Sequence, residues 1–156
     1  MGVWCGLIGV YLGNNVFKWS IYKPFPLSGI KDDIYIKPAD SHNLLRPETV
    51  ESLFYMFSIT REQQYQEWGW KIFNAFENYT KLTEGYTSIN NVKNPRNVEH
   101  RNKMESFFLG ETLKYFYLLF QNPADNEGRI WPELDKWVFN TEAHMLPVRD
   151  GMKVSR

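Results

Sequence analysis

Cysteine, charge of one sign and long apolar runs are all scarce in this sequence. Its 156 residues contain a single cysteine, Cys5, so no disulfide can form within the chain and a cysteine-rich metal site is excluded. The 18 Lys and Arg residues balance 18 Asp and Glu residues, and no basic patch stands out, which makes nucleic acid a poor candidate partner. The apolar residues 3–13 fall short of the roughly 20 that span a membrane. Because no Lys or Arg precedes them, we interpret them as a lead-in rather than a signal-peptide core.

Several nucleotide-binding and hydrolase motifs are also absent. The sequence contains no P-loop, no dinucleotide-binding fingerprint, no HExxH and no GxSxG. What it does contain is 43% hydrophobic and 23% charged residues, which is typical of a globular domain or part of one. Aromatic residues reach 17%, including six Trp, and such rings can fill a core or stack on the faces of sugars.

The apolar spacing predicts three helices, and an all-α fold class. The first two, over residues 47–59 and 62–80, are separated by a few residues and therefore form an antiparallel hairpin. The third, over residues 103–120, is apolar almost all round and should be buried on most sides, which requires a larger body to pack against.

Extended structure is expected in three shorter segments. Residues 33–37 form a possible short extended piece, and residues 84–95 read as a loop that has room for a short strand. Residues 137–148 have strand-like character on both sides of an Asn-Thr-Glu centre, which predicts a β-hairpin.

The start of the first predicted helix gathers charge. Pro47 suits the first helical position, and Glu48 and Glu51 lie three residues apart, so the two carboxylates share a face next to Arg46. Carboxylates held this close need a cation, a shared proton or strong solvation, as in acid–base or metal sites. The alternative is that both acids only complement the positive end of the helix dipole.

The third predicted helix carries a second candidate site. Glu111 lies four residues after Phe107, so the ring and the carboxylate share a face. A ring beside an acid suits a sugar, because the ring covers its C–H face and the acid accepts hydrogen bonds from its hydroxyl groups. The alternative is a salt bridge from Glu111 to Lys114.

The third candidate is the centre of the predicted hairpin, residues 140–144. The hydroxyl and carbonyl oxygens of Thr141, with the carboxylate of Glu142 beside them, are the hard oxygen ligands that Ca²⁺ prefers. Turn residues often look like this, so the signal by itself is weak. His144 is interpreted as a packed or surface residue rather than a ligand.

Five blocks of the sequence stand out together. They are residues 36–52 (IKPADSHNLLRPETVES), 68–70 (WGW), 85–92 (GYTSINNV), 103–115 (KMESFFLGETLKY) and 138–144 (VFNTEAH). These blocks resemble the C-terminal part of the class I α-1,2-mannosidases of glycoside hydrolase family 47, occur in the order of the family and cover about residues 32–148. The sequence LRPETVES favours the processing enzymes of the endoplasmic reticulum and Golgi over the degradation-enhancing relatives.

The resemblance implies a fold and an activity. Members form an (α/α)7 barrel plugged by a C-terminal β-hairpin, and they trim α-1,2-linked mannose from high-mannose N-glycans on glycoproteins. They invert the anomeric centre and need Ca²⁺. The parent enzyme would be anchored in the membrane of the endoplasmic reticulum or Golgi by a segment outside this sequence.

The resemblance also implies roles for individual residues. Glu48 resembles the general base. Arg46, Phe107 and Glu111 resemble the residues that bind the mannose. The metal-site residues are Thr141, which resembles the direct Ca²⁺ ligand, and Glu51 and Glu142, which resemble ligands acting through water.

The general acid of the family lies upstream of the matched blocks, and residues 1–31 show no match to it by motif. We therefore expect residues 32–150 to be the C-terminal part of a catalytic domain, and the 156-residue chain to be inactive by itself. Two alternatives remain: a non-catalytic module that binds mannose, and a purely structural all-α domain.

Overall fold

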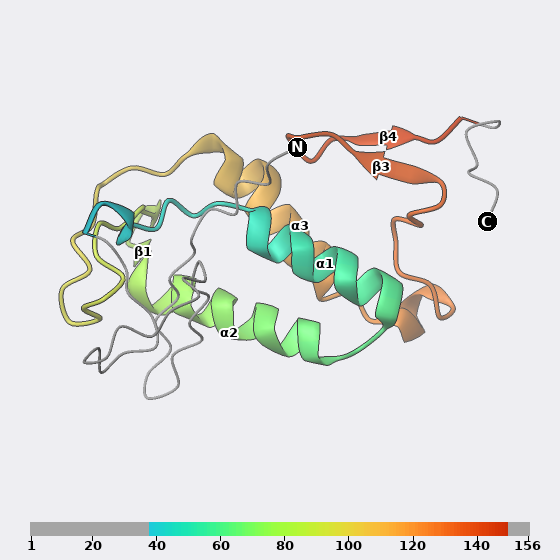
Figure 1. Cartoon of the computed structure of the whole chain (residues 1–156), viewed down its shortest axis with the longest axis horizontal. Coiled ribbons are helices and arrows are strands. Elements are labelled where there is room, and N and C mark those ends of the chain that lie inside the picture. Colours follow the sequence, from blue (N-terminus) through green and yellow to red (C-terminus); the bar gives the residue numbers. More distant parts are fainter. Residues whose placement is uncertain (1–37, 150–156) are drawn as a thin grey trace, which may run out of the picture.

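The computed structural model describes residues 38–149, and a layer of helices dominates it (Figure 1). The chain passes through a 3₁₀ turn, Pro38–Asp40, into α1, Glu48–Thr60, and then α2, Gln64–Tyr79. A helical segment from residue 106 to 119 contains a π-helical turn, Phe108–Thr112, and ends as α3, Leu113–Leu119. Another 3₁₀ turn, Pro123–Asn126, leads into the last strands.

The predicted helical hairpin is confirmed. The α1 helix ends where Arg61 adopts a left-handed conformation, with φ 64°, and donates its N–H to the Phe57 carbonyl. The following turn is short, and α2 returns beside α1 in the opposite direction (Figure 1).

The third helix begins later than the sequence predicted. Lys103 is not helical because its backbone is already engaged with an extended neighbour. Its carbonyl accepts a hydrogen bond from the N–H of Ser88, and its own N–H donates to the Thr87 hydroxyl, at 2.8 Å and 3.1 Å. Helical structure therefore starts at residue 106 rather than 103.

Two antiparallel hairpins accompany the helices. Strands β1, Lys81–Leu82, and β2, Gly85–Tyr86, pair with each other, and only β2 lies in the loop predicted over residues 84–95. Strands β3, Trp137–Phe139, and β4, Met145–Pro147, pair Phe139 with Met145 and confirm the hairpin expected over residues 137–148.

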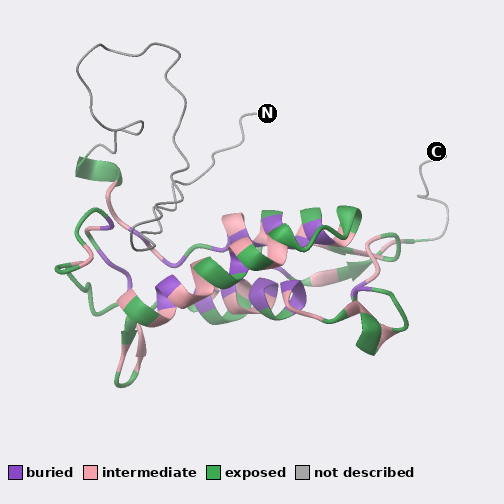
Figure 2. Cartoon of the chain, turned by 90° about the horizontal axis from the view of Figure 1, so that it is seen from below, coloured by how far each residue is buried: buried purple, intermediate pink, exposed green. Residues whose placement is uncertain are grey.

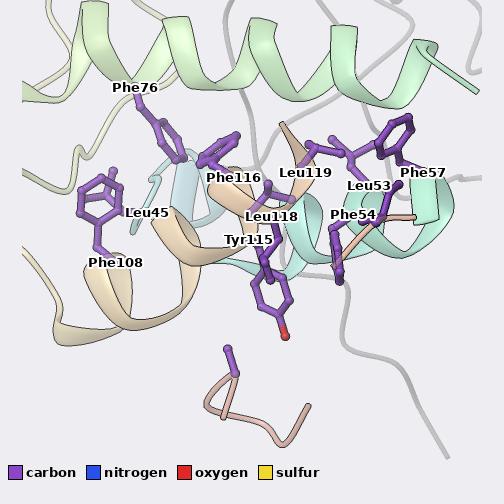
Figure 3. Packing of buried hydrophobic residues seen from close by; sticks show 13 residues of the cluster. Leu45, Leu53, Phe54, Phe57, Phe76, Phe108, Tyr115, Phe116, Leu118 and Leu119 are labelled. Atoms are coloured by element: carbon purple, nitrogen blue, oxygen red, sulfur yellow. The ribbon is translucent and has the colours of Figure 1, made fainter. Parts of the chain in front are cut away.

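The core lies between the helices, where buried residues line their facing sides (Figure 2). Phe76 of α2 meets the rings of Phe108 and Phe116, at centroid distances of 6.2 Å and 5.9 Å. On the far side of α3 from α2, the Tyr115 hydroxyl projects out of this core (Figure 3).

The expectation that the third helix is buried on most sides is wrong for one of its faces. Leu109 and Tyr117 are 58% and 71% exposed, because α1, α2 and the β3–β4 hairpin leave that side of the helix uncovered.

Two earlier expectations lie outside the described residues, namely the extended piece at 33–37 and the lead-in at 1–31. Within residues 38–149, no helix combines the length and the apolar character needed to cross a membrane.

Candidate active site

The start of α1 brings three of the predicted residues together. The guanidinium of Arg46 lies over the Phe107 ring, 5.6 Å from its centroid, in a cation–π contact. The same side chain approaches the carboxylate of Glu48, with 3.9 Å between Nη1 and Oε1. Arg46 and Glu48 are each about half exposed, at 47% and 45%, so this small group of charges borders the solvent.

One turn along α1, Glu51 faces the other helix. Its Oε1 accepts a hydrogen bond of 3.1 Å from the hydroxyl of Tyr115, a buried residue of α3. Burial and then the negative charge of Glu48 raise the pKa of Glu51, and the Tyr115 hydrogen bond opposes that rise. Burial and then the negative charge of Glu51 raise the pKa of Tyr115, so the Tyr115 hydroxyl remains a proton donor.

The tip of the β3–β4 hairpin is fixed from inside and from outside. Inside the turn, the Asn140 side-chain oxygen accepts hydrogen bonds from the N–H groups of Glu142 and His144, at 3.0 Å and 2.8 Å. From outside, Lys114 Nζ donates to the carbonyl of Ala143 at 2.9 Å. The tip therefore lies against the helix that carries Glu111, and Thr141 is exposed in its turn.

The last strand residue before the hairpin turn, Phe139, packs against the helices. The ring of Phe139 lies 5.5 Å from that of Tyr115 and 6.0 Å from that of Phe54. Since Tyr115 also holds Glu51, one aromatic residue links the hairpin to the charged end of α1.

The pKa of Glu111 depends on charged residues from all these segments. Burial raises its pKa first, and the negative charges of Glu142, Glu48 and Glu51 raise it further, while Lys114 lowers it. Carboxylates from α1, the π-helical turn and the hairpin tip thus face a common region. Lys114, the alternative partner of Glu111, lies near enough to lower its pKa, and its ammonium group donates its hydrogen bond to the hairpin.

Comparison with known protein families matches residues 12–148 to Glycosyl hydrolase family 47. The chain belongs to glycosyl hydrolase family 47. The match begins inside the segment 1–31, for which motifs alone offered no counterpart.

Named relatives agree with this family 47 assignment. The chain is 57% identical over 117 residues to the endoplasmic reticulum mannosyl-oligosaccharide 1,2-alpha-mannosidase of Rattus norvegicus, covering 74% of this chain and 17% of that protein. It is 54% identical over 138 residues to the Homo sapiens enzyme of the same name, covering 88% and 18%. The chain thus spans less than a fifth of the length of these relatives.

A solved structure shows the same arrangement. The alpha-1,2-mannosidase from Trichoderma reesei superposes with a TM-score of 0.61 at 37% identity, covering 70% of this chain and 22% of that one. The resemblance to α-1,2-mannosidases is therefore confirmed at the level of family and local fold.

The fit of a family 47 site to Ca²⁺ can be judged from the donor atoms. Within residues 38–149, no three His, Cys, Asp or Glu side chains lie close enough together to hold a metal ion as direct ligands. The carboxylates do converge, however, and Glu48 Oε2 is buried without a hydrogen-bond partner. The hydroxyl and carbonyl oxygens of Thr141, which is exposed at the hairpin tip, are hard donors of the kind that Ca²⁺ accepts.

Sequence reasoning missed two residues that arrange this site. Tyr115 was counted only as apolar, and Lys114 only as the partner of Glu111; the structure gives each a contact to another segment. Tyr115 lies four residues after Glu111, so the helical spacing that paired Phe107 with Glu111 could have placed it on the same face.

Proposed function

We propose that this chain supplies the general base, the mannose-binding residues and the Ca²⁺-binding residues of an inverting α-1,2-mannosidase that trims high-mannose N-glycans. The observation that carries the proposal is that residues of the third helix contact both segments in a chain of family 47: Tyr115 donates to Glu51 at the start of α1, and Lys114 donates to Ala143 at the hairpin tip. The remainder of an (α/α)7 barrel, with the general acid that the resemblance places upstream, would complete the site.

The mannose would rest against the Phe107 ring. Arg46, held over that ring and beside Glu48, places positive charge where hydroxyl oxygens of the sugar would lie. Glu111, which is partly buried and lies four residues after Phe107, can accept hydrogen bonds from sugar hydroxyl groups once it is ionised.

Glu48 would act as the general base. Its unpartnered Oε2 can accept a proton from a water molecule, whose oxygen then attacks the anomeric carbon while the bond to the leaving sugar breaks. The leaving oxygen takes its proton from the general acid on the opposite side. Bound Ca²⁺ would supply positive charge that offsets the carboxylates and orients oxygen ligands.

The proposal also places the protein in the secretory pathway. The relatives from Rattus norvegicus, Homo sapiens and Schizosaccharomyces pombe are named as endoplasmic reticulum enzymes. We infer the same compartment, or the Golgi, with anchoring in its membrane.

Binding and turnover test the proposal separately. Calorimetry of the 156-residue chain with α-1,2-mannobiose should show binding that requires Ca²⁺ and weakens on the order of tenfold in Phe107→Ala, since a stacked ring is lost. Tyr117→Ala, which removes an exposed ring elsewhere on the same helix, is the matched control. Absence of binding by the unaltered chain would overturn the proposal.

The same disaccharide serves for turnover. Because the resemblance assigns the acid to a region upstream of residue 32, we expect no release of mannose by the 156-residue chain alone. Release at enzyme-like rates would show that a residue of the 156-residue chain supplies the general acid.

A further inference from the structure

We propose that Thr112 is a positioning residue of this site, whose buried hydroxyl locks the start of α1 to the helix that carries Phe107 and Glu111. The proposal rests on the function proposed above and adds a residue to it. The Thr112 hydroxyl donates a hydrogen bond of 2.6 Å to the carbonyl of Leu45, the residue directly before Arg46. Both Thr112 and Leu45 are 0% exposed, so water cannot replace either partner.

Four other hydroxyl groups, in helices or at a helix end, behave differently. The usual partner of a Ser or Thr hydroxyl inside a helix is the carbonyl four residues earlier. Ser52, Ser58, Thr60 and Thr80 all follow this rule, bonding to the carbonyls of residues 48, 54, 56 and 76. Thr112 instead reaches across to a residue 67 positions away.

The π-helical turn explains the exception. In this turn the Phe108 carbonyl, which lies four residues before Thr112, accepts the N–H of Leu113. The Thr112 hydroxyl is then directed to the neighbouring segment. π-helical turns inside α-helices occur frequently at functional sites, and this one directly follows Phe107 and contains Glu111.

The other end of the link is equally constrained. Leu45 has a positive φ of 61°, which is uncommon for a residue other than glycine and needs support from its surroundings. Its N–H donates to the Asn43 side-chain oxygen at 2.7 Å, and the backbone of Asn43 pairs with Ile89. Both polar groups of the Leu45 backbone are therefore occupied, and the direction in which the chain enters α1 is fixed.

Two site groups depend on this link. Arg46 and Glu48 follow Leu45 within three residues, whereas Phe107 and Glu111 precede Thr112. The hydrogen bond thus sets the distance between the base and the sugar platform, and Arg46 over the Phe107 ring is the contact that reports this distance.

Substitutions at Thr112 separate the hydroxyl from the side-chain shape. Thr112→Val keeps the shape and removes the donor, Thr112→Ser keeps the donor, and Thr112→Cys has an intermediate, weak donor. In the 156-residue chain, NMR should show NOEs between the Arg46 side chain and the Phe107 ring in the unaltered protein and in T112S. We expect these NOEs to be lost in T112V and weakened in T112C.

Binding gives the second measurement. Affinity for α-1,2-mannobiose with Ca²⁺, normalised to the folded fraction, should fall on the order of tenfold in T112V, less in T112C, and stay within about twofold in T112S. A purely structural role would lower the stability of T112V without changing the affinity or the NOEs of the molecules that remain folded. If T112V does not fold, the comparison of T112C with T112S decides.

Each outcome supports or opposes the proposal. NOEs and affinity that are unchanged in T112V or T112C would overturn it, as would the absence of the Arg46–Phe107 NOEs in the unaltered chain. If the unaltered chain shows the NOEs but binds no mannobiose, the proposed function fails, and the NOEs of the variants still decide the role of Thr112.

Discussion

Glu51 and Glu111 illustrate how neighbouring side chains prepare a carboxylate cluster. Burial is the larger reason for the raised pKa of each, and the charges of other carboxylates in the cluster add to it. In the absence of a cation, these charges oppose folding. Elsewhere, Glu77 and Glu133 have lowered pKa values because lysines pair with them.

This contrast predicts how stability depends on pH without Ca²⁺. A carboxyl whose pKa is raised in the folded state holds its proton more tightly when folded, so its contribution to stability is lost as pH rises above about 4.5 toward the raised value. We expect urea unfolding to show the chain becoming less stable as pH rises through that window, and Glu111→Gln to flatten the slope. Glu77 and Glu133, whose pKa values are lowered, act in the opposite sense: their contribution to stability is lost as pH falls below about 4.5. The same slope in Glu111→Gln as in the unaltered chain would contradict the assignment.

Lys114 gives a second prediction about a single side chain. Its ammonium group donates to the Ala143 carbonyl, so Lys114→Met should free the hairpin tip and lower the free energy of unfolding by about 1 kcal/mol. Hydrogen exchange at the amides of Glu142 and His144 should rise with it. Lys71→Met, at an exposed position of α2, is the matched control and should change neither quantity.

The packing of α2 against α3 depends on one small residue. A Cβ on Gly69 would lie 2.3 Å from Cδ2 of the fully buried Leu119, so the side chain or the helix must shift. Gly69→Ala should therefore destabilise the chain by about 1–3 kcal/mol, measured by chemical unfolding. In contrast, a Cβ on Gly110 meets nothing within 4 Å, so Gly110→Ala should be neutral or stabilising by up to about 1 kcal/mol. Equal effects of the two substitutions would show that α2 and α3 are not in contact as described.

The elements differ in how far the sequence predicts them. The α1–α2 pair was predictable because its apolar spacing and short turn are local features. The hydrogen bond from the π-helical turn to Leu45 was not, because Thr112 and its acceptor lie 67 residues apart in the sequence. The late start of the third helix has the same kind of cause, since residues 87 and 88 occupy the backbone of Lys103.

The site was predicted in a similar, partial way. Helical spacing predicts the group of Arg46, Glu48 and Glu51 and the pair of Phe107 and Glu111. The oxygen-rich turn indicates Thr141 and Glu142, and the family resemblance supplied the individual roles. Their convergence on one region could not be read from spacing, because it depends on the Lys114 and Tyr115 contacts between segments. The roles of these residues in binding Ca²⁺ and mannose stay predictions.

Across the whole described molecule, large apolar side chains remain at the surface. Trp70 on α2 is 54% exposed and Ile59 on α1 is 73% exposed, although both belong to helices with well-buried inner faces. The chain covers 22% of the Trichoderma reesei mannosidase chain. The sequence-based expectation that a larger body covers these helices stays a prediction.

If one cation joins the start of α1 to the hairpin tip, Ca²⁺ stabilises the folded 156-residue chain, and thermal unfolding during Ca²⁺ titration measures this effect. A ligand bound only by the folded state stabilises by about 2.7 kcal/mol at a concentration one hundredfold above its dissociation constant. We expect Ca²⁺ to raise the midpoint, Mg²⁺ at equal concentration to raise it far less, and Thr141→Val to remove most of the Ca²⁺ effect. A midpoint that does not respond to millimolar Ca²⁺, or that responds equally in Thr141→Val, would contradict the account.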